Sequence, residues 1–259
     1  MNYQYLIFEQ KDNALIITLN RPEALNAINT HLMKELNNFF NRDIDNYRIK
    51  GIIIQGSGEK AFAAGADIKE FEGLSAAQAE IMSTYGQETY FAIEKCKIPV
   101  IAVIKGFALG GGCELAMACH LRVGGPKARF GQPEVNLGLP PGYGATQRLV
   151  QLIGRSKALE MLLTTDMVDV TEAYRLGLVN YIANENEELS LALKIVEKLA
   201  TKSPIGIQKV IECVNAYGDK EKDGYYTEAA AFGICAGTED FKEGAVAFVE
   251  KRKPIFNGK

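Results

Sequence analysis

The chain has 259 residues, of which 47% are hydrophobic and 24% are charged, a balance typical of a globular protein with a sizeable core. The formal net charge of −3 provides no basic surplus, which argues against a nucleic-acid partner. The sequence has no recognisable signal peptide or membrane span, and its five scattered cysteines indicate reduced thiols rather than a disulfide framework. These features predict a cytoplasmic protein with no membrane association.

The amino-terminal part of the chain alternates between expected strands and expected helices. Apolar runs at residues 5–8 and 15–19 predict a hairpin, because a short polar turn separates them. The spacing of apolar residues predicts a helix over residues 30–44, followed by a short buried strand at residues 52–54. A second, longer helix is expected over residues 75–96.

The next stretch, from residue 98 to residue 119, is the centre of the predicted site. Ile98-Pro-Val-Ile-Ala-Val-Ile104 is a continuous apolar run, which predicts a buried strand. Gly110-Gly-Gly112 then interrupts the pattern, and Cys113-Glu-Leu-Ala-Met-Ala-Cys119 has helical character. A glycine-rich turn that leads into a helix leaves backbone N–H groups free to bind an anionic group.

The remainder of the chain changes from mixed to helical character. Up to residue 184 we expect strands at residues 120–124 and 178–182, helices at residues 145–153, 157–163 and 171–177, and a rigid loop at residues 138–144. Beyond it we expect only helices, at residues 189–200, 204–216, 227–235 and 239–251. The fold class is therefore α/β, with a mainly parallel core at residues 1–184 and a helical region at residues 185–259.

Two loops of small residues are candidates for binding through the main chain. Gly110-Gly-Gly112 alone is weak evidence, because most glycine clusters are plain turns. Ala63-Ala-Gly-Ala66 strengthens it, since this loop also lies between an expected strand and an expected helix start. Together the two loops can supply one amide each to a developing oxyanion.

Two carboxylates, Glu114 and Glu134, lie close to these loops in the sequence. A glutamate near a helix start is most often a solvated cap, and Glu134 can equally form a salt bridge. The apolar neighbours of Glu114 favour a buried setting, which would raise its pKa and couple it to a second carboxyl group. Only convergence on one site would make the pair catalytic.

Several other sites are disfavoured by the sequence. With only His31 and His120 available, neither a histidine-based metal site nor a serine triad is expected. Cys113 is interpreted as a buried small residue rather than a nucleophile. Neither G-x-G-x-x-G nor G-x-x-x-x-G-K-[ST] occurs, so we do not expect these types of nucleotide site.

Further patterns extend along nearly the whole chain: Asn20-Arg-Pro-Glu-Ala-Leu-Asn-Ala27, Ala61-Phe-Ala-Ala-Gly-Ala-Asp-Ile-Lys69, Gly110-Gly-Gly-Cys-Glu-Leu-Ala116, Phe130-Gly-Gln-Pro-Glu134, Gly144-Ala-Thr-Gln-Arg148 and Ala173-Tyr-Arg-Leu-Gly-Leu-Val179. In this order they resemble the enoyl-CoA hydratase/isomerase (crotonase) superfamily, and within it the enoyl-CoA hydratases. The resemblance implies a crotonase-like spiral of ββα units. It also implies a lyase that adds water, in syn fashion, to a short 2-enoyl-CoA in fatty-acid or butanoate metabolism.

The resemblance also implies roles for individual residues. The amides of Ala66 and Gly111 would form an oxyanion hole around the thioester carbonyl. Glu114 would orient and deprotonate the water, and Glu134 would supply the proton to C2. Residues implied to lie near CoA or the acyl chain are Ala24, Leu25, Lys60, Ala64, Asp67, Ile68, Lys69 and Gly142.

The resemblance further implies self-association through the helical carboxyl-terminal region, as a homotrimer or as a hexamer built from two trimers. No metal and no separate cofactor are expected, because coenzyme A is part of the acyl-CoA substrate.

The sequence departs from the usual family pattern at His120, Ala145 and Pro140-Pro141. The two prolines stiffen their loop, and this leaves the preferred length of the acyl chain open. An enoyl-CoA isomerase, or another acyl-CoA lyase, is the alternative. A non-catalytic or RNA-binding relative is a remote one, because the long helices carry few basic residues.

Overall fold

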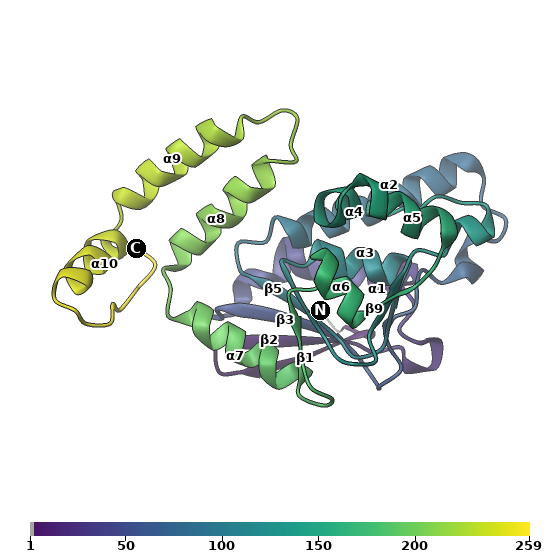
Figure 1. Ribbon diagram of the computed structural model, residues 1–259, viewed down its shortest axis with the longest axis horizontal. Coiled ribbons are helices and arrows are strands. Elements are labelled where there is room, and N and C mark those ends of the chain that lie inside the picture. Colours follow the sequence, from purple (N-terminus) through teal and green to yellow (C-terminus); the bar gives the residue numbers. More distant parts are fainter. Residues whose placement is uncertain (1–2) are drawn as a thin grey trace.

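The computed structural model describes residues 3–259 and contains two sheets, helices packed around them and a projecting group of carboxyl-terminal helices (Figure 1). The large sheet runs in the order β1 (Leu6–Lys11), β2 (Ala14–Leu19), β3 (Gly51–Gly56), β5 (Val100–Ile104), β7 (Leu121–Gly124) and β10 (Tyr181–Ile182). β1 and β2 form the expected antiparallel hairpin. From β2 onward every pairing is parallel.

The small sheet runs in the order β4 (Ala61–Ala63), β6 (Phe107–Leu109), β8 (Arg129–Gly131) and β9 (Val168–Asp169). The first three strands are parallel, and β9 is antiparallel to β8. The chain places β3, β5 and β7 in the large sheet and, immediately after each, β4, β6 and β8 in the small one. A helix follows each pair, so the expected spiral of ββα units is confirmed.

Glycine permits the sharp passage from one sheet to the other. A Cβ atom on Gly56 would lie 2.4 Å from the carbonyl oxygens of Ala61 and Phe62. A Cβ atom on Gly106 would lie 2.1 Å from the carbonyl oxygen of Lys60. Both corners therefore require a residue without a side chain.

The helices are α1 (Thr30–Asn38), α2 (Ala76–Glu94), α3 (Gly111–Ala118), α4 (Ala145–Ile153), α5 (Arg155–Thr164), α6 (Val170–Leu176), α7 (Glu188–Ala200), α8 (Pro204–Ala216), α9 (Gly224–Ala236) and α10 (Glu239–Val249). The alternation of side chains along each strand divides the core between the two faces of the large sheet. Ile52 and Ile54 join the larger cluster, with residues of α1, α2 and α3. Ile53 faces the other way and packs with Ala192 and Val196 of α7.

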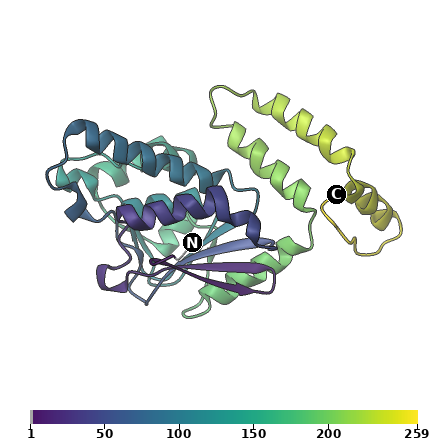
Figure 2. The ribbon, with the colours of Figure 1, turned by 180° about the vertical axis from the view of Figure 1, so that it is seen from behind.

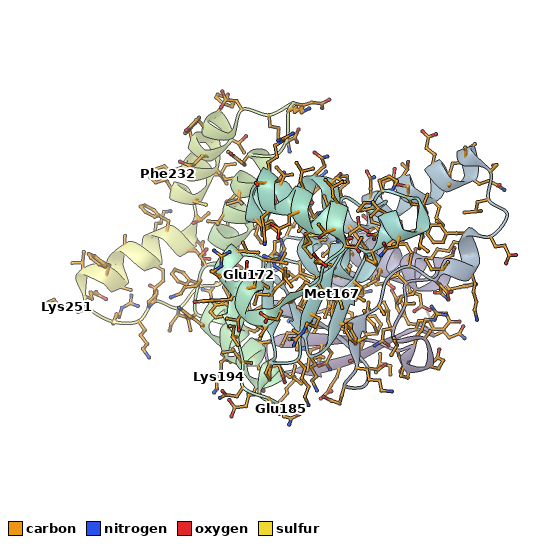
Figure 3. The ribbon with its side chains drawn as sticks, turned by 45° about the vertical axis from the view of Figure 1, so that its right-hand side comes forward. Met167, Glu172, Glu185, Lys194, Phe232 and Lys251 are labelled. Atoms are coloured by element: carbon orange, nitrogen blue, oxygen red, sulfur yellow. The ribbon has the colours of Figure 1, made fainter. Side chains whose placement is uncertain are left out.

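Helices α8, α9 and α10 form an arm that extends away from the sheets (Figures 1 and 2). Figure 3 shows Phe232 of α9 out on this arm, far from the core. The apolar side chains of the arm are mostly exposed: Tyr225 is 90%, Phe232 75% and Phe248 85% accessible. The single chain therefore does not bury the apolar surface of its own arm.

Three details differ from the sequence-based prediction. The helix expected over residues 30–44 ends as an α-helix at Asn38, and continues as a π-helical turn, η2 (Phe39–Asp43), and a 3-10 turn, η3 (Ile44–Asn46). The strand expected at residues 178–182 is shorter and comprises only Tyr181–Ile182, as β10. The short strands β4 and β6 were not predicted. The division after residue 184 stays a prediction, although α7, which follows it, packs on the sheet.

Within residues 3–259, no helix combines the length and the apolar character needed to cross a membrane.

Candidate active site

Three parallel strands of the small sheet end at one edge, and each leads into a segment of the predicted site. β4 pairs with β6, and β6 pairs with β8. Because the carboxyl ends of parallel strands meet at the same edge, the chain brings Ala66, Gly111 and Glu134 together there. Glu114 follows Gly111 within the first turn of α3. The topology thus unites residues from three separate parts of the sequence.

The backbone amides of Ala66 and Gly111 are neighbours. A Cβ atom on Gly111 would lie 3.4 Å from the Ala66 nitrogen. Gly111 is the first residue of α3, where an N–H group has no partner inside the helix. Within residues 3–259, neither amide donates a hydrogen bond to a protein acceptor. Two unpaired N–H groups, one at the positive end of a helix dipole, suit a developing negative charge.

Glu114 has a buried carboxyl group, with only 1% of the residue exposed. Its Oε1 accepts hydrogen bonds from the backbone N–H groups of Tyr143 (2.8 Å) and Ala145 (2.9 Å). Burial, with a smaller contribution from the charge of Glu134, raises the pKa of Glu114 to about 7, although the two amides act in the opposite direction. A carboxyl group with this pKa can exchange a proton near neutral pH.

Glu134 begins the 3-10 turn η5 (Glu134–Leu137), and its carboxyl group lies against the start of α3. A Cβ atom on Gly110 would come within 2.6 Å of the Glu134 Oε1, so glycine at this position leaves room for the carboxyl group. The buried Gln132, with its amide nitrogen turned toward Glu134, donates to both carboxyl oxygens at 3.1 Å. Burial raises the pKa of Glu134 as well.

Comparison with known proteins assigns the family. The sequence profile of the enoyl-CoA hydratase/isomerase family matches residues 9–259. The chain belongs to this family. It is 41% identical to the crotonyl-CoA hydratase of Syntrophomonas wolfei subsp. wolfei, over 100% of both chains. It is 37% identical to the short-chain-enoyl-CoA hydratase of Clostridium acetobutylicum, over 98% of this chain and 97% of that protein.

Solved structures of family members share the fold. The enoyl-CoA hydratase of Bacillus anthracis superimposes with a TM-score of 0.92 at 34% identity, over 99% of this chain and 100% of that one. An enoyl-CoA hydratase subunit of Geobacillus kaustophilus gives a TM-score of 0.93 at 36% identity, over 99% of both chains. The family and the fold expected from the sequence are both confirmed.

The carboxyl groups of Glu114 and Glu134 are near enough that the charge of Glu134 raises the pKa of Glu114. Two neighbouring carboxyls resist carrying two negative charges, so over a range of pH one is protonated while the other is ionised. One member of the Glu114–Glu134 pair can then accept a proton while the other donates one. The adjacent amides of Ala66 and Gly111 can stabilise the enolate-like oxygen that forms on a thioester.

Some of the predicted CoA-binding residues do lie together. The Ala64 N–H donates to the Leu25 carbonyl oxygen at 3.1 Å, which places residues 24 and 25, at the end of the 3-10 turn η1 (Pro22–Ala24), beside the loop that contains Ala66. Leu25 has a φ of 50° and an exposed side chain. Ile68 and Lys69 are exposed in the 3-10 turn η4 (Ile68–Phe71). Their contact with CoA stays a prediction.

Other predicted residues lie apart from this group. The exposed Lys60 precedes β4, at the opposite end of the strand from Ala66. The carbonyl oxygen of Gly142 accepts hydrogen bonds from Ser83 (2.6 Å) and Gln87 (3.0 Å), which fixes it against α2. For these residues too, a contact with CoA or the acyl chain stays a prediction.

Asp67 has a partner within the protein. The Arg21 Nη2 lies 2.9 Å from the Asp67 Oδ2, and this hydrogen-bonded guanidinium lowers the pKa of Asp67. Arg21 also donates to the carbonyl oxygen of Ala27, so the ion pair ties the two predicted CoA loops to each other. Its position indicates that Asp67 helps to shape these loops.

A cavity of about 330 Å³ opens beside Tyr143. Its walls come from α1, η4 and α2, and they are mainly apolar, with Met33, Leu74 and Met82 among them. The Tyr143 ring also lies 3.2 Å from the position of a Cβ atom on Gly111. The Tyr143 ring therefore touches both the cavity and the start of α3, and the cavity has a size suited to a small apolar group.

Cys113 and His120, for which the sequence disfavoured a nucleophilic or metal-binding role, have structural roles. Cys113 is fully buried, which confirms the prediction of a buried small residue, and burial raises the pKa of its thiol to about 12. His120 accepts a hydrogen bond from the Val100 N–H through Nδ1 (2.8 Å), and its Nε2 lies 3.1 Å from the Glu94 carbonyl oxygen. Among residues 3–259, no group of three or more metal-ligating side chains converges.

Two residues of the site were not identified from the sequence. Gln132 holds Glu134, and Arg148 donates to the carbonyl oxygen of Tyr143 at 2.8 Å. Both lie inside motifs quoted above, Phe130-Gly-Gln-Pro-Glu134 and Gly144-Ala-Thr-Gln-Arg148, which were the available signal. The motifs alone did not indicate what Gln132 and Arg148 do, because the tertiary fold determines which groups they contact.

Proposed function

We propose that this chain is a short-chain enoyl-CoA hydratase, a lyase that converts a 2-enoyl-CoA and water into a 3-hydroxyacyl-CoA. The observation that carries the proposal is the coupled pair of carboxyl groups, Glu114 and Glu134, beside two unpaired amides. Full-length similarity to a crotonyl-CoA hydratase and to a short-chain-enoyl-CoA hydratase supports the same reaction. A role in fatty-acid or butanoate-type metabolism follows from this chemistry.

In the proposed reaction the two acids divide the proton transfers. Ionised Glu114, whose Oε1 is occupied by two amides, takes a proton from the water as the water oxygen bonds to C3. Protonated Glu134 gives its proton to C2 on the same face, which accounts for syn addition. A proton then passes from Glu114 back to Glu134, so that one water is consumed and both acids return to their initial states.

The negative charge that develops on the thioester oxygen meets the amides of Ala66 and Gly111. In known enzymes, loss of one such donor costs about 3–4 kcal/mol of transition-state stabilisation. These donors are neighbouring groups of the backbone, held in place by the fold, so they need little reorganisation during the reaction. No metal and no separate cofactor enter the proposed mechanism, since CoA arrives as part of the substrate.

Assembly and location belong to the same proposal. The exposed aromatic side chains of the arm, among them Tyr225, Phe232 and Phe248, support self-association as a homotrimer, alone or paired into a hexamer. All five cysteines are free thiols, which supports a reducing cytoplasmic environment.

The test follows the loss of enoyl-thioester ultraviolet absorbance with crotonyl-CoA. We expect hydration by the native protein, and a fall of about a thousandfold in Glu114→Gln and in Glu134→Gln, because each removes a general acid–base group. Circular dichroism and size-exclusion chromatography check that the variants keep their fold and assembly. Full activity in both variants would refute the mechanism. Movement of a double bond without a 3-hydroxy product would instead favour an isomerase.

A second measurement tests the acyl preference, because the cavity of about 330 Å³ beside Tyr143 has a size suited to a small apolar group. A series of 2-enoyl-CoAs with acyl chains of increasing length tests it. For a short-chain enzyme kcat/KM falls steadily as carbons are added beyond the crotonyl group. A maximum at a long acyl chain would contradict the short-chain part of the proposal.

A further inference from the structure

Arg148 of α4 is a buried guanidinium behind the catalytic carboxyl groups, with 4% of the residue exposed. Its Nη1 donates to the Tyr143 carbonyl oxygen at 2.8 Å, and its Nη2 lies 3.0 Å from the Glu94 Oε2. Its guanidinium carbon also lies 5.3 Å from the centre of the Phe91 ring. A cation enclosed in this way is costly to bury unless its contacts compensate, so the arrangement demands a physical explanation.

The contacts of Arg148 converge on the turn that holds Glu114. In Tyr143 the carbonyl oxygen binds Arg148, while the N–H binds Glu114 at 2.8 Å. Gly144 follows with a φ of 107°, and a Cβ atom there would lie 2.4 Å from the Arg148 Nη1. Ala145 then supplies the second N–H to Glu114. The guanidinium therefore packs directly against the backbone that presents both amides.

Glu94, the last residue of α2, fixes the other end of Arg148. Its carboxylate forms the ion pair, and its carbonyl oxygen accepts a hydrogen bond from Asn215 of α8 at 2.7 Å. The Nε2 of His120 lies 3.1 Å from the same carbonyl oxygen. Glu94 is thus held at both its backbone and its side chain, and it can serve as a rigid anchor.

We propose that Arg148, anchored by Glu94, is a positioning residue for hydration, which orders the turn at residues 143–145 so that its two amides hold the Glu114 carboxylate. This inference rests on the proposed function. Arg148 does not need to touch the substrate. It acts through the Tyr143 peptide group, and through the electrostatic effect of its charge on Glu114.

The charge of Arg148 opposes the other groups that face Glu114. Burial raises the pKa of Glu114 to about 7, and the Glu134 charge raises it as well, whereas the Arg148 charge lowers it. Tyr90 from α2 and Tyr143 from the turn also face Glu114, as does its neighbour Cys113, and all three are neutral because burial raises their pKa. Removing the cation should therefore move the titration of Glu114 to higher pH.

The experiment compares Arg148→Met and Arg148→Lys with the native enzyme in crotonyl-CoA hydration between pH 5 and pH 9. In Arg148→Met we expect kcat to fall about ten- to a hundredfold with little change in KM, because the general base is misplaced. The acid limb of the kcat/KM profile should move up by about half to one pH unit. Arg148→Lys keeps the charge, so its acid limb stays in place, but its single ammonium cannot reproduce the two-sided contact and kcat still falls.

The matched control is Arg122→Met, which removes a second buried guanidinium. The Arg122 guanidinium donates to the backbone carbonyl oxygens of Leu178 (2.7 Å), Cys119 (2.6 Å) and Ala116 (3.4 Å). We expect it to lower the thermal stability without moving the acid limb. If Arg148→Met does not fold, Glu94→Gln replaces it. That variant keeps the cation but weakens its anchor, and we expect a three- to tenfold fall in kcat with no upward movement of the acid limb.

An acid limb and kcat like those of the native enzyme in folded Arg148→Met, or an unchanged kcat in Glu94→Gln, would overturn the inference. An equal movement of the acid limb in Arg122→Met would overturn it too, because general loosening would then explain the result. A native protein that does not hydrate crotonyl-CoA would refute the proposed function, and the inference with it. The two failures are therefore distinguishable.

Discussion

Helix α3 buries its apolar side chains, whereas helix α9 leaves most of its own exposed. All eight residues of α3 are buried, including Glu114. In α9, which has 13 residues, only Ala231 is buried, although the helix has a higher share of aromatic side chains. The fold of the single chain therefore fixes the position of α3 completely, whereas it leaves the surface of α9 available to another molecule.

This contrast implies that the core carries the proposed chemistry and that the arm serves assembly. The candidate catalytic groups of α3 are closely packed, so even an added methyl group there should disturb the proposed chemistry. Substitutions on the arm should act first on assembly, because the exposed side chains contribute little to folding of the single chain. The following predictions test this division, in order of decreasing effect.

The largest effect is expected for Gly110→Ala. The new Cβ atom would lie 2.6 Å from the Glu134 Oε1, and the φ of 47° disfavours any side chain. Displacement of this carboxyl group should lower kcat/KM for crotonyl-CoA by about a hundredfold or more, with the assembly unchanged.

Gly73→Ala is the matched control, because Gly73 also has a positive φ, of 76°, but its added Cβ atom meets nothing within 4 Å. It should cost some stability and little activity. Comparable losses of activity in both variants would mean that backbone strain, rather than contact with Glu134, is responsible.

The second prediction concerns the arm. The double substitution of Phe232→Glu and Phe248→Glu places charges on two of its most exposed side chains. Light scattering should show the mass of a single chain, while circular dichroism shows native helix content. Tyr174→Glu, at an exposed aromatic residue of α6, is the control and should leave the assembly intact. A double variant that assembles like the native chain would remove the proposed role of the arm.

The third prediction concerns the free energy of unfolding, which the buried charge of Glu114 lowers. Its folded-state pKa is raised to about 7, above the unfolded value, so its ionisation destabilises the fold as pH rises from about 4.5 to about 7. Glu114→Gln keeps an oxygen for both amides and removes the charge. Its free energy of unfolding at pH 8 should exceed that of the native chain by up to about 3 kcal/mol. Denaturant unfolding at pH 4 and pH 8 checks this, and a difference that does not grow with pH would contradict it.

The smallest effect is expected at His120, where the core meets the arm through the Glu94 carbonyl oxygen. Burial lowers the pKa of His120, so the unfolded chain binds the proton more readily. Stability should be complete above about pH 6.5 and decline as pH falls toward the lower folded pKa. His120→Gln should flatten this decline in thermal unfolding measured between pH 5 and pH 7.5. An unaltered slope would assign the decline to other groups.

Sequence reasoning succeeded where a pattern is long or local. The helix expected over residues 75–96 is observed as α2, with Ser75 and Gln78 forming its capping box. The two small-residue loops and the two glutamates do converge on one edge of the small sheet. The spiral itself came only from the family resemblance, because three-residue strands such as β4 and β6 are too short to show a period of two.

The features that the sequence did not predict depend on contacts between residues far apart in the chain. The pattern of apolar residues over 30–44 is the same for an α-helix and for the π-helical turn that replaces its end. The proposed role of Arg148 depends on Glu94, 54 positions away, and on a turn whose shape depends on the φ of Gly144. Such partners are specified by the tertiary fold, and no spacing within a motif indicates them.

The two proposed oxyanion donors are main-chain amides, which has a consequence for mutational surveys of this protein. Every residue except proline carries an N–H group, so replacing Ala66 or Gly111 changes the available space and leaves the donor in place. A conventional alanine scan would therefore pass over both donors. Exchange of a single peptide bond for an ester, which deletes one N–H and adds no bulk, would reveal them.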